Sequence, residues 1–337
     1  GLPADDAGIH SGATTIVDQG SAGAWTVGGF KGHIADHAKT DVRSFVSANL
    51  AGALQGGMEG TTLHSPDMTR VDEIVRVANE YPGFVKGIKS HAESGGLSHW
   101  GTTVLEMALV AADQADLPIY VHTGELFPVN EATRPGAETV LKKAVSLLRP
   151  GDTLAHVYSA MPDGIMGQSQ SIPPAVFEAL EKGIHFDIGY GLNFSYAIAS
   201  RMLEAEIVPH TISSDVHADF NGYHDDSKLD YSLCGAMTRL WGLGMALEQV
   251  IARTTYHPAQ LIREENEIGT LAVGSRADIT ILNCEQGPWT LSDGQAETLT
   301  VDQRLIPAWV IRAGELIEPN QRLLRDVCHP LSTAGNG

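Results

Sequence analysis

The stretch Tyr120-Val121-His122-Thr123-Gly124-Glu125 decides the fold, because a β-rich apolar run ends there at a side chain able to bind a metal. The same pattern recurs elsewhere: a buried strand is predicted, and a polar residue stands where it ends. Four such strands in one chain predict a barrel with its chemistry at one rim. The other three stretches are Gly87-Ile88-Lys89, Leu154-Ala155-His156 and Ser213-Ser214-Asp215-Val216-His217.

Seven strands are predicted in all, with helical patterns between them. Strands that alternate with helices predict a parallel sheet with right-handed crossovers. Repeats of roughly 30 to 40 residues favour a closed (β/α)8 TIM-type barrel. The alternative is an open doubly wound sheet, but the Gly-x-Gly-x-x-Gly turn typical of that fold does not follow the first strand. The predicted strands cover residues 12–18, 42–50, 84–89, 117–122, 152–156, 185–189 and 211–215.

The tail changes character after residue 266. Residues 268–282 and 308–317 alternate between apolar and polar positions and turn at glycines, which predicts strands of a small β-sandwich domain. The polar stretch 283–303 is predicted to be loop-rich. The expected organisation is a barrel over 1–266, a small β domain over 267–320 and a tail over 321–337.

Composition limits the possible partners. The chain has 337 residues and a formal charge of −19, so its surface repels phosphate backbones and anionic membranes. We therefore expect a small-molecule substrate and neither a nucleic acid nor a membrane partner. Three widely separated cysteines without a Cys-x-x-Cys argue against a disulfide framework and fit a cytoplasmic location. The sequence contains no run of about 18 apolar residues, so no transmembrane helix is expected.

A metal site is predicted from Lys89, His122, His156 and Asp215, which each end a separate strand. Side chains at the C-terminal ends of parallel strands converge on one face. Two imidazoles and a carboxylate suit a divalent metal such as Zn²⁺, one or two ions, which lowers the pKa of bound water and polarises a carbonyl. Asp215 is positioned to move a proton from that water to the leaving group. Burial lowers the pKa of a lysine amine, and a neutral amine reacts with CO₂ to give a carbamate, an anionic ligand.

Each of these residues also has an ordinary interpretation. A histidine at a strand end is commonly a hydrogen-bonded structural residue, Asp215 can cap the next helix, and Lys89 can form a salt bridge at the rim. The shared position on four strands favours the metal site. Nearby, His91, Glu125 and His217 are predicted to contact substrate or to orient a ligand. His64 is predicted to lie on the surface.

These motifs resemble the metal-dependent amidohydrolase superfamily, in particular its dihydroorotase-like and N-acyl deacetylase branch. The resemblance covers nearly the whole chain. It implies that Lys89 is a carboxylated bridging ligand, that His122 and His156 hold the second metal, and that Asp215 binds the first metal as general base and acid. The implied reaction is attack of a metal-bound hydroxide on an amide or ester carbonyl. The motifs are 12–23, 87–89, 121–125, 155–156, 187–189, 213–217 and 269–278.

The sequence departs from this superfamily in two ways. In the superfamily, the first barrel strand ends in His-x-His, and this sequence contains no such pair. The first strand and the N-terminal part of the β domain are therefore expected either to precede Gly1 or to be absent. Seven strands leave two edges of an eight-stranded barrel open, so a partner, a rearranged segment or a further piece of chain is expected to cover the gap. A homo-oligomer is expected. Deacetylase relatives also commonly carry an arginine where this chain has His91, which makes acyl amino acids less secure as substrates.

Three functions remain open on the sequence. The first is a metal-dependent hydrolase of a non-peptide amide, a cyclic amide or an ester, which the four strand ends favour. The second is a non-catalytic amidohydrolase-fold binding protein, which the missing His-x-His favours. The third is a phosphotriesterase-like lactonase, which shares the carboxylated lysine but generally lacks the β tail.

Overall fold

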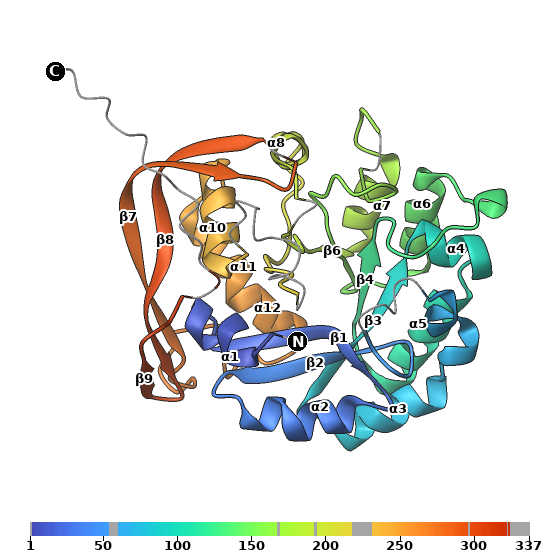
Figure 1. The fold of residues 1–337 in the computed structure, drawn as a ribbon, viewed down its shortest axis with the longest axis horizontal. Coiled ribbons are helices and arrows are strands. Elements are labelled where there is room, and N and C mark those ends of the chain that lie inside the picture. The colour runs from blue at the N-terminus through green and yellow to red at the C-terminus, as the bar shows by residue number, and fades with distance from the viewer. Residues whose placement is uncertain are drawn as a thin grey trace. The chain divides into compact units, whose positions relative to one another are not determined.

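The computed structural model describes residues 2–53, 60–166, 169–191, 194–217, 231–295, 297–321 and 323 (Figure 1). The chain divides into two compact units. Unit 1 comprises Gly1–Thr15, Ile188–Ile207 and Thr211–Gly337, and unit 2 comprises Ile16–Asp187 and Val208–His210. Unit 2 contains three of the four predicted metal ligands, and unit 1 contains the fourth, Asp215.

Unit 2 is built on a six-stranded sheet whose strands follow one another in sequence order. From β2 to β6 each strand pairs in parallel with the next, so their carboxyl ends share one edge. Lys89 stands opposite Tyr120, and His91 opposite His122. The strands are β1 (Thr15–Gly23), β2 (Asp41–Ser47), β3 (Val85–Ala92), β4 (Ile119–Thr123), β5 (Thr153–Leu154) and β6 (His185–Phe186).

Helices connect these strands, as the alternating pattern predicts, and Figure 1 shows them along the outer side of the sheet. All five residues of β4 are buried, which is typical of a parallel strand covered on both faces. Helix α7 has a proline in its first turn and ends at Gly183, whose φ of 77° is the left-handed conformation that glycine adopts readily. The helices are α2 (Val27–His33), α3 (Val71–Glu80), α4 (Ser94–Trp100), α5 (Thr103–Ala115), α6 (Ala137–Leu147) and α7 (Pro174–Lys182).

The seventh predicted strand, residues 211–215, is not a named strand in the described part of the chain. Two parallel-type hydrogen bonds nevertheless hold it beside residues 188–190: Ile188 N–H donates to the Thr211 carbonyl (3.2 Å) and Tyr190 N–H to the Ser213 carbonyl (3.1 Å). Asp215 then turns out of the extended conformation, with φ of 47°. The segment therefore runs as a short, weakly paired continuation of the strand pattern.

The tail contains a three-stranded antiparallel sheet, with strands β7 (Ile279–Ser292), β8 (Thr298–Arg312) and β9 (Glu315–Ile317) in that order. The predicted loop over 283–303 is therefore wrong, because most of it forms the long β7–β8 hairpin. Its polar residues pair across the strands, as Arg304 does with Glu285 at 2.7 Å. Such cross-strand pairs stabilise strands whose sequence is polar. Residues 268–278, predicted as strand, form turns and irregular backbone instead.

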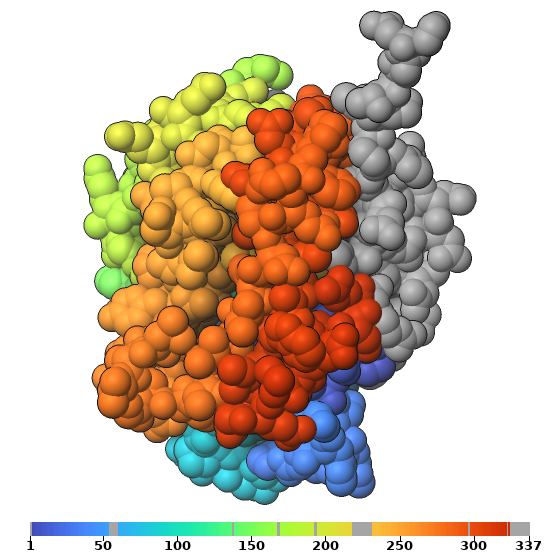
Figure 2. Space-filling view, turned by 90° about the vertical axis from the view of Figure 1, so that its left-hand side faces the viewer, coloured from blue at the N-terminus to red at the C-terminus, as the bar shows by residue number. Residues whose placement is uncertain are grey.

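Unit 1 packs this sheet against helices. Helix α10 contacts β8, and Figure 2 shows β7 and β8, orange to red, beside the gold helices. Ile9, Val310 and Ile317 form a small buried cluster under the sheet. The helices are α1 (Ala4–Ala7), α8 (Tyr196–Glu204), α10 (Leu233–Gly242), α11 (Leu247–Thr254) and α12 (Tyr256–Leu261). Among the described residues, none forms a helix with the length and apolar character needed to cross a bilayer.

Candidate functional site

Lys89 lies in β3 and is 8% exposed. Its Nζ stands 4.5 Å from the centroid of the Tyr120 ring on β4, an arrangement that attracts a cation to the ring face. The aliphatic stem runs over Gly20 of β1, where a Cβ would lie only 2.8 Å from Lys89 Cγ. Glycine at position 20 thus leaves the space that this lysine occupies.

Tyr120 is fixed in turn by Asp187. The tyrosine hydroxyl donates a hydrogen bond to Asp187 Oδ2 at 2.7 Å, and both residues are buried. Asp187 follows β6, and its backbone carbonyl accepts from Val157 N–H at 3.1 Å. The sequence marked this aspartate only as part of a motif, and its contact with Tyr120 depends on residues 67 positions apart.

The two predicted imidazole ligands of unit 2 lie together. His122 Nδ1 and His156 Nε2 are 2.9 Å apart, at the carboxyl ends of the adjacent strands β4 and β5. Both residues are nearly buried, at 8% and 7% exposure. A hydrogen bond at this distance requires one ring to donate while the other accepts.

His156 has a strained backbone. Its φ is 64°, a conformation that a residue other than glycine adopts at a cost of about 1 to 2 kcal/mol. The chain leaves β5 at this residue, and its neighbours Ala155 and Val157 donate to the carbonyls of Val121 and Asp187. Backbone strain of this kind is found preferentially at functional sites.

His91 extends the imidazole group beyond His122. Their ring centroids are 5.4 Å apart, and His64 lies 5.6 Å from His91 on its other side. Phe127 stacks on His64 at 3.8 Å. Burial lowers the pKa of His91 well below its ordinary value, and Lys89, His64 and His156 lower the pKa further, so this imidazole is neutral at pH 7.

Burial raises the pKa of two carboxylates in unit 2, Glu93 and Asp18. Glu93 is 1% exposed and caps helix α4, accepting from Gly95 N–H at 2.6 Å and from Gly96 N–H. Burial raises the pKa of Glu93, against the effect of these hydrogen bonds. Burial also raises the pKa of Asp18 in β1, and the charge of Lys89 acts in the opposite direction.

Glu125 is held by an arginine. Arg134 Nη1 contacts Glu125 at 2.8 Å and Asp163 at 2.7 Å, and Arg134 also pairs with Glu131. This network ties the segment after β4 to the segment after β5. The predicted role of Glu125 toward substrate or ligand stays a prediction.

Asp215 and His217 lie together within unit 1. His217 Nε2 is 3.1 Å from Asp215 Oδ1, and their side chains are 56% and 32% exposed. Asp215 Oδ2 lies 3.9 Å from where a Cβ on Gly191 would stand. Their predicted roles, as general base and ligand and as a substrate contact, stay predictions.

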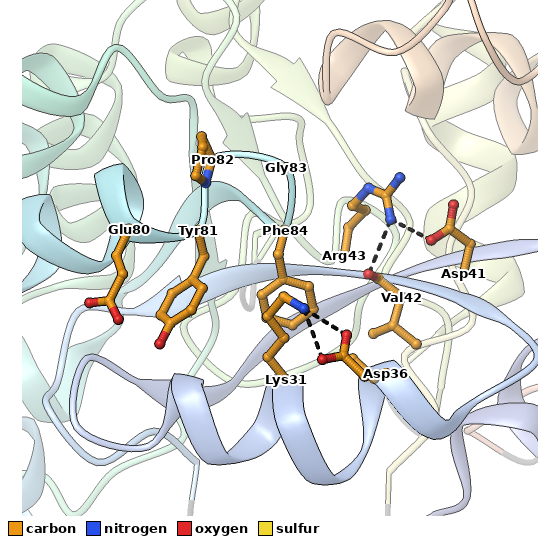
Figure 3. A pocket seen from close by; sticks show the side chains of 11 residues that line it. Lys31, Asp36, Asp41, Val42, Arg43, Glu80, Tyr81, Pro82, Gly83 and Phe84 are labelled. Atoms are coloured by element: carbon orange, nitrogen blue, oxygen red, sulfur yellow. Dashed lines mark hydrogen bonds and ion pairs between the residues drawn. The ribbon is translucent and has the colours of Figure 1, made fainter.

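A cavity lies elsewhere in unit 2. It has a volume of about 410 Å³ and opens where β2 begins and where the chain enters β3 (Figure 3). Its charged groups are paired, with Lys31 Nζ 2.6 Å from Asp36 and Arg43 bonded to Asp41. Residues at the amino ends of parallel barrel strands mainly serve stability, so this cavity is not the catalytic candidate.

The structure therefore brings together His122 and His156, with Lys89 on the neighbouring strand and His91 beside them. Within the described residues, no group of three or more histidine, cysteine, aspartate or glutamate side chains is arranged to hold a metal. His64, predicted to be on the surface, is instead half-buried against Phe127. No sequence signal linked His64 to His91, since they belong to different elements 27 positions apart.

Comparisons with known proteins bear on the fold and on the class of enzyme. The sequence matches no family model. It is 26% identical over 323 residues to a protein named deacetylase from Brucella anthropi, covering 95% of this chain and 75% of that protein. An adenine deaminase structure matches with a TM-score of 0.80 and 26% identity over 93% of this chain and 80% of its own. A dihydroorotase structure matches with a TM-score of 0.79 and 24% identity over 97% and 80%.

These likenesses extend over nearly the whole chain, and their TM-scores near 0.8 show a common fold. The chain has the TIM-type barrel fold of the amidohydrolases, accompanied by the separate antiparallel sheet β7–β9. It is a hydrolase of their type.

Proposed function

We propose that this chain is a metal-dependent amidohydrolase that cleaves a non-peptide amide, a cyclic amide or an ester of a small molecule, in the manner of a deacetylase or dihydroorotase. The observation that carries the proposal is the pair His122 and His156, two buried imidazoles 2.9 Å apart at adjacent strand ends. The deacetylase name of a relative that covers 95% of the chain supports an acyl substrate.

The donor chemistry fits a divalent metal. Two nitrogens bound to one tetrahedral Zn²⁺ at about 2.0 to 2.1 Å lie roughly 3.3 Å apart. The ring nitrogens of His122 and His156 are 2.9 Å apart, so a small rotation of either ring suffices. A metal held there would polarise a substrate carbonyl and lower the pKa of water.

Lys89 is the proposed third ligand, as a carboxylated lysine. Its place on β3, beside the strand that carries His122, supports this role. In the uncarboxylated form, the Tyr120 ring favours an ammonium at that position. Tyr120, itself fixed by Asp187, thereby holds the uncarboxylated side chain beside His122's strand.

Asp215 is proposed to move the proton from water to the leaving group, with His217 orienting its carboxylate. A small-molecule substrate, a cytoplasmic location and a homo-oligomer belong to the same proposal. The charge of −19 supports its further part, that neither a nucleic acid nor an anionic membrane is a partner.

The test combines metal analysis with turnover. The protein is expressed with Zn²⁺ and bicarbonate, desalted, and analysed for bound metal. It is then assayed on N-acetyl amino acids, dihydroorotate and p-nitrophenyl acetate. We expect one or two ions per chain and hydrolysis that is lost in His156→Asn. A parent protein that binds no metal, or hydrolysis that persists unchanged in His156→Asn, would contradict the proposal.

A further inference from the structure

A second, smaller pocket of unit 2 lies beside the proposed catalytic imidazoles. It is enclosed by the ends of β2 and β3, the helices α4 and α5, and the segment after β4. Its walls are the imidazoles of His64 and His91, the ring of Phe127, and the aliphatic side chains of Leu97, Val104 and Leu105. These residues come from five separate parts of the chain, so only the fold assembles the pocket.

The pocket lies next to the reacting centre of the proposed function. His91 forms one of its walls, and the His91 ring is centred 5.4 Å from the His122 ring. A substrate bound with its carbonyl beside His122 could therefore direct one substituent of that carbonyl past His91 into the pocket.

The pocket offers a substrate no positively charged lysine or arginine, since none is among the described residues that line it. Its one carboxylate, Glu93, accepts from the N–H groups of Gly95 and Gly96. Its one carboxamide, Asn49, accepts from Gly52 N–H at 2.7 Å and donates to Ser47 Oγ at 2.9 Å. An anionic group entering the pocket would lose its hydration and meet a carboxylate, without a lysine or arginine in the described lining to pair with.

The pocket is also small and firmly walled. Its volume is about 30 Å³, and one water-sized sphere needs roughly 10 to 15 Å³ on this measure. Leu105 and Phe127 are 2% and 5% exposed, so dense packing backs both walls. A Cβ at Gly95 would meet the Phe127 carbonyl oxygen at 2.3 Å, which shows how closely α4 approaches the segment after β4.

We propose that this pocket binds the short uncharged alkyl part of the substrate's acyl group, such as the methyl of an acetyl amide or ester. The inference rests on the proposed function and specifies its substrate class. Acetyl and propionyl groups fit, while butyryl and longer chains, or an acidic acyl group such as succinyl, do not.

The turnover test varies the acyl chain and the leaving group separately. Metal-loaded protein is assayed on p-nitrophenyl acetate, propionate, butyrate and hexanoate, and then on acetate esters of other phenols. We expect kcat/KM to fall about 10-fold or more for each methylene beyond the filled pocket. In Leu97→Ala, and independently in Val104→Ala, the preferred chain should lengthen by one or two carbons. Leu180→Ala, at an exposed position of α7, is the matched control and should keep the parent profile.

A binding test does not depend on turnover. Saturation-transfer NMR detects contact of acetamide, propionamide and butyramide with the protein. Acetamide and propionamide should bind the parent, and butyramide should bind Leu97→Ala several-fold better than the parent. Selectivity that follows the leaving group, or chain-length profiles identical in Leu97→Ala and Leu180→Ala, would overturn the pocket assignment. An intact binding series without any ester or amide hydrolysis would instead refute the proposed function and leave the pocket standing.

Discussion

The two ends of the same parallel strands in unit 2 differ in size and in chemistry. The amino ends of β2 and β3 border an open cavity of about 410 Å³ in which opposite charges pair, as Lys31 does with Asp36. The carboxyl ends border a pocket of about 30 Å³ that is lined by the imidazoles of His64 and His91, and the His91 ring is centred 5.4 Å from the His122 ring. The larger opening is lined by ion pairs, and the smaller one mainly by imidazole, aromatic and aliphatic side chains.

This contrast teaches that volume alone does not locate a catalytic site. An ion pair in solvent satisfies its own charges and leaves little to offer a ligand. The buried imidazoles of His122 and His156 are of the kind that binds metals, and His156 also has a strained backbone. The following changes test whether the two ends differ in function as they do in structure.

The largest effect is expected from the imidazoles at the carboxyl ends. His122→Asn should lower metal content and hydrolysis by about 100-fold or more, because a ligand loss exceeds the 10- to 100-fold typical of the groups that only orient ligands. The matched control is His185→Asn at the start of β6, where His185 stacks on His210 at 3.7 Å. Equal losses in both variants, measured by elemental analysis and kcat/KM, would contradict the contrast between the strand ends.

The next effect concerns the space for Lys89. Gly20 has φ of 89°, and Ala at this position would push against the lysine stem, so Gly20→Ala should destabilise the protein by at least about 1 to 2 kcal/mol. Gly29→Ala in α2, with nothing within 4 Å, should instead stabilise it by about 0.5 to 1 kcal/mol. Urea denaturation measures both. Similar changes in the two variants would mean that the Gly20–Lys89 contact is not tight in solution.

A smaller, pH-dependent effect is expected at Glu93. Burial raises its pKa, so the folded protein binds more protons than the unfolded chain between the ordinary pKa and the raised one. Its stabilising contribution is therefore fully present below the ordinary value and is lost as the pH rises through the raised pKa. Relative to Glu93→Gln, the parent should gain unfolding free energy between pH 7 and pH 5. A difference independent of pH, in paired denaturation curves, would show that the carboxyl is not perturbed.

The smallest effect is expected at the amino ends. Lys31→Ala breaks a partly exposed ion pair and should change stability by no more than about 1 kcal/mol, without altering kcat/KM. Hydrolysis rates and thermal unfolding of the variant provide the measurement. A clear loss of activity would give the large cavity a function and reverse the comparison.

The sequence by itself determined where the chain's strands end in polar residues. Lys89 and His122 each follow an apolar β-branched run, and the structure places both near the carboxyl ends of neighbouring strands. Such positions can be recognised in the sequence because both faces of a parallel strand are buried and apolar, so that a polar side chain marks the strand's end. The barrel fold followed from the same pattern.

Only the tertiary structure decided which of these residues face one another. The 2.9 Å contact of His122 with His156, the bond from Tyr120 to Asp187 and the stack of His64 on Phe127 join residues 34, 67 and 63 positions apart. The polar hairpin of β7 and β8 likewise depends on cross-strand partners that no local pattern reveals. Periodicity records which face a side chain takes on its own element, whereas its partners are set by register and packing between elements.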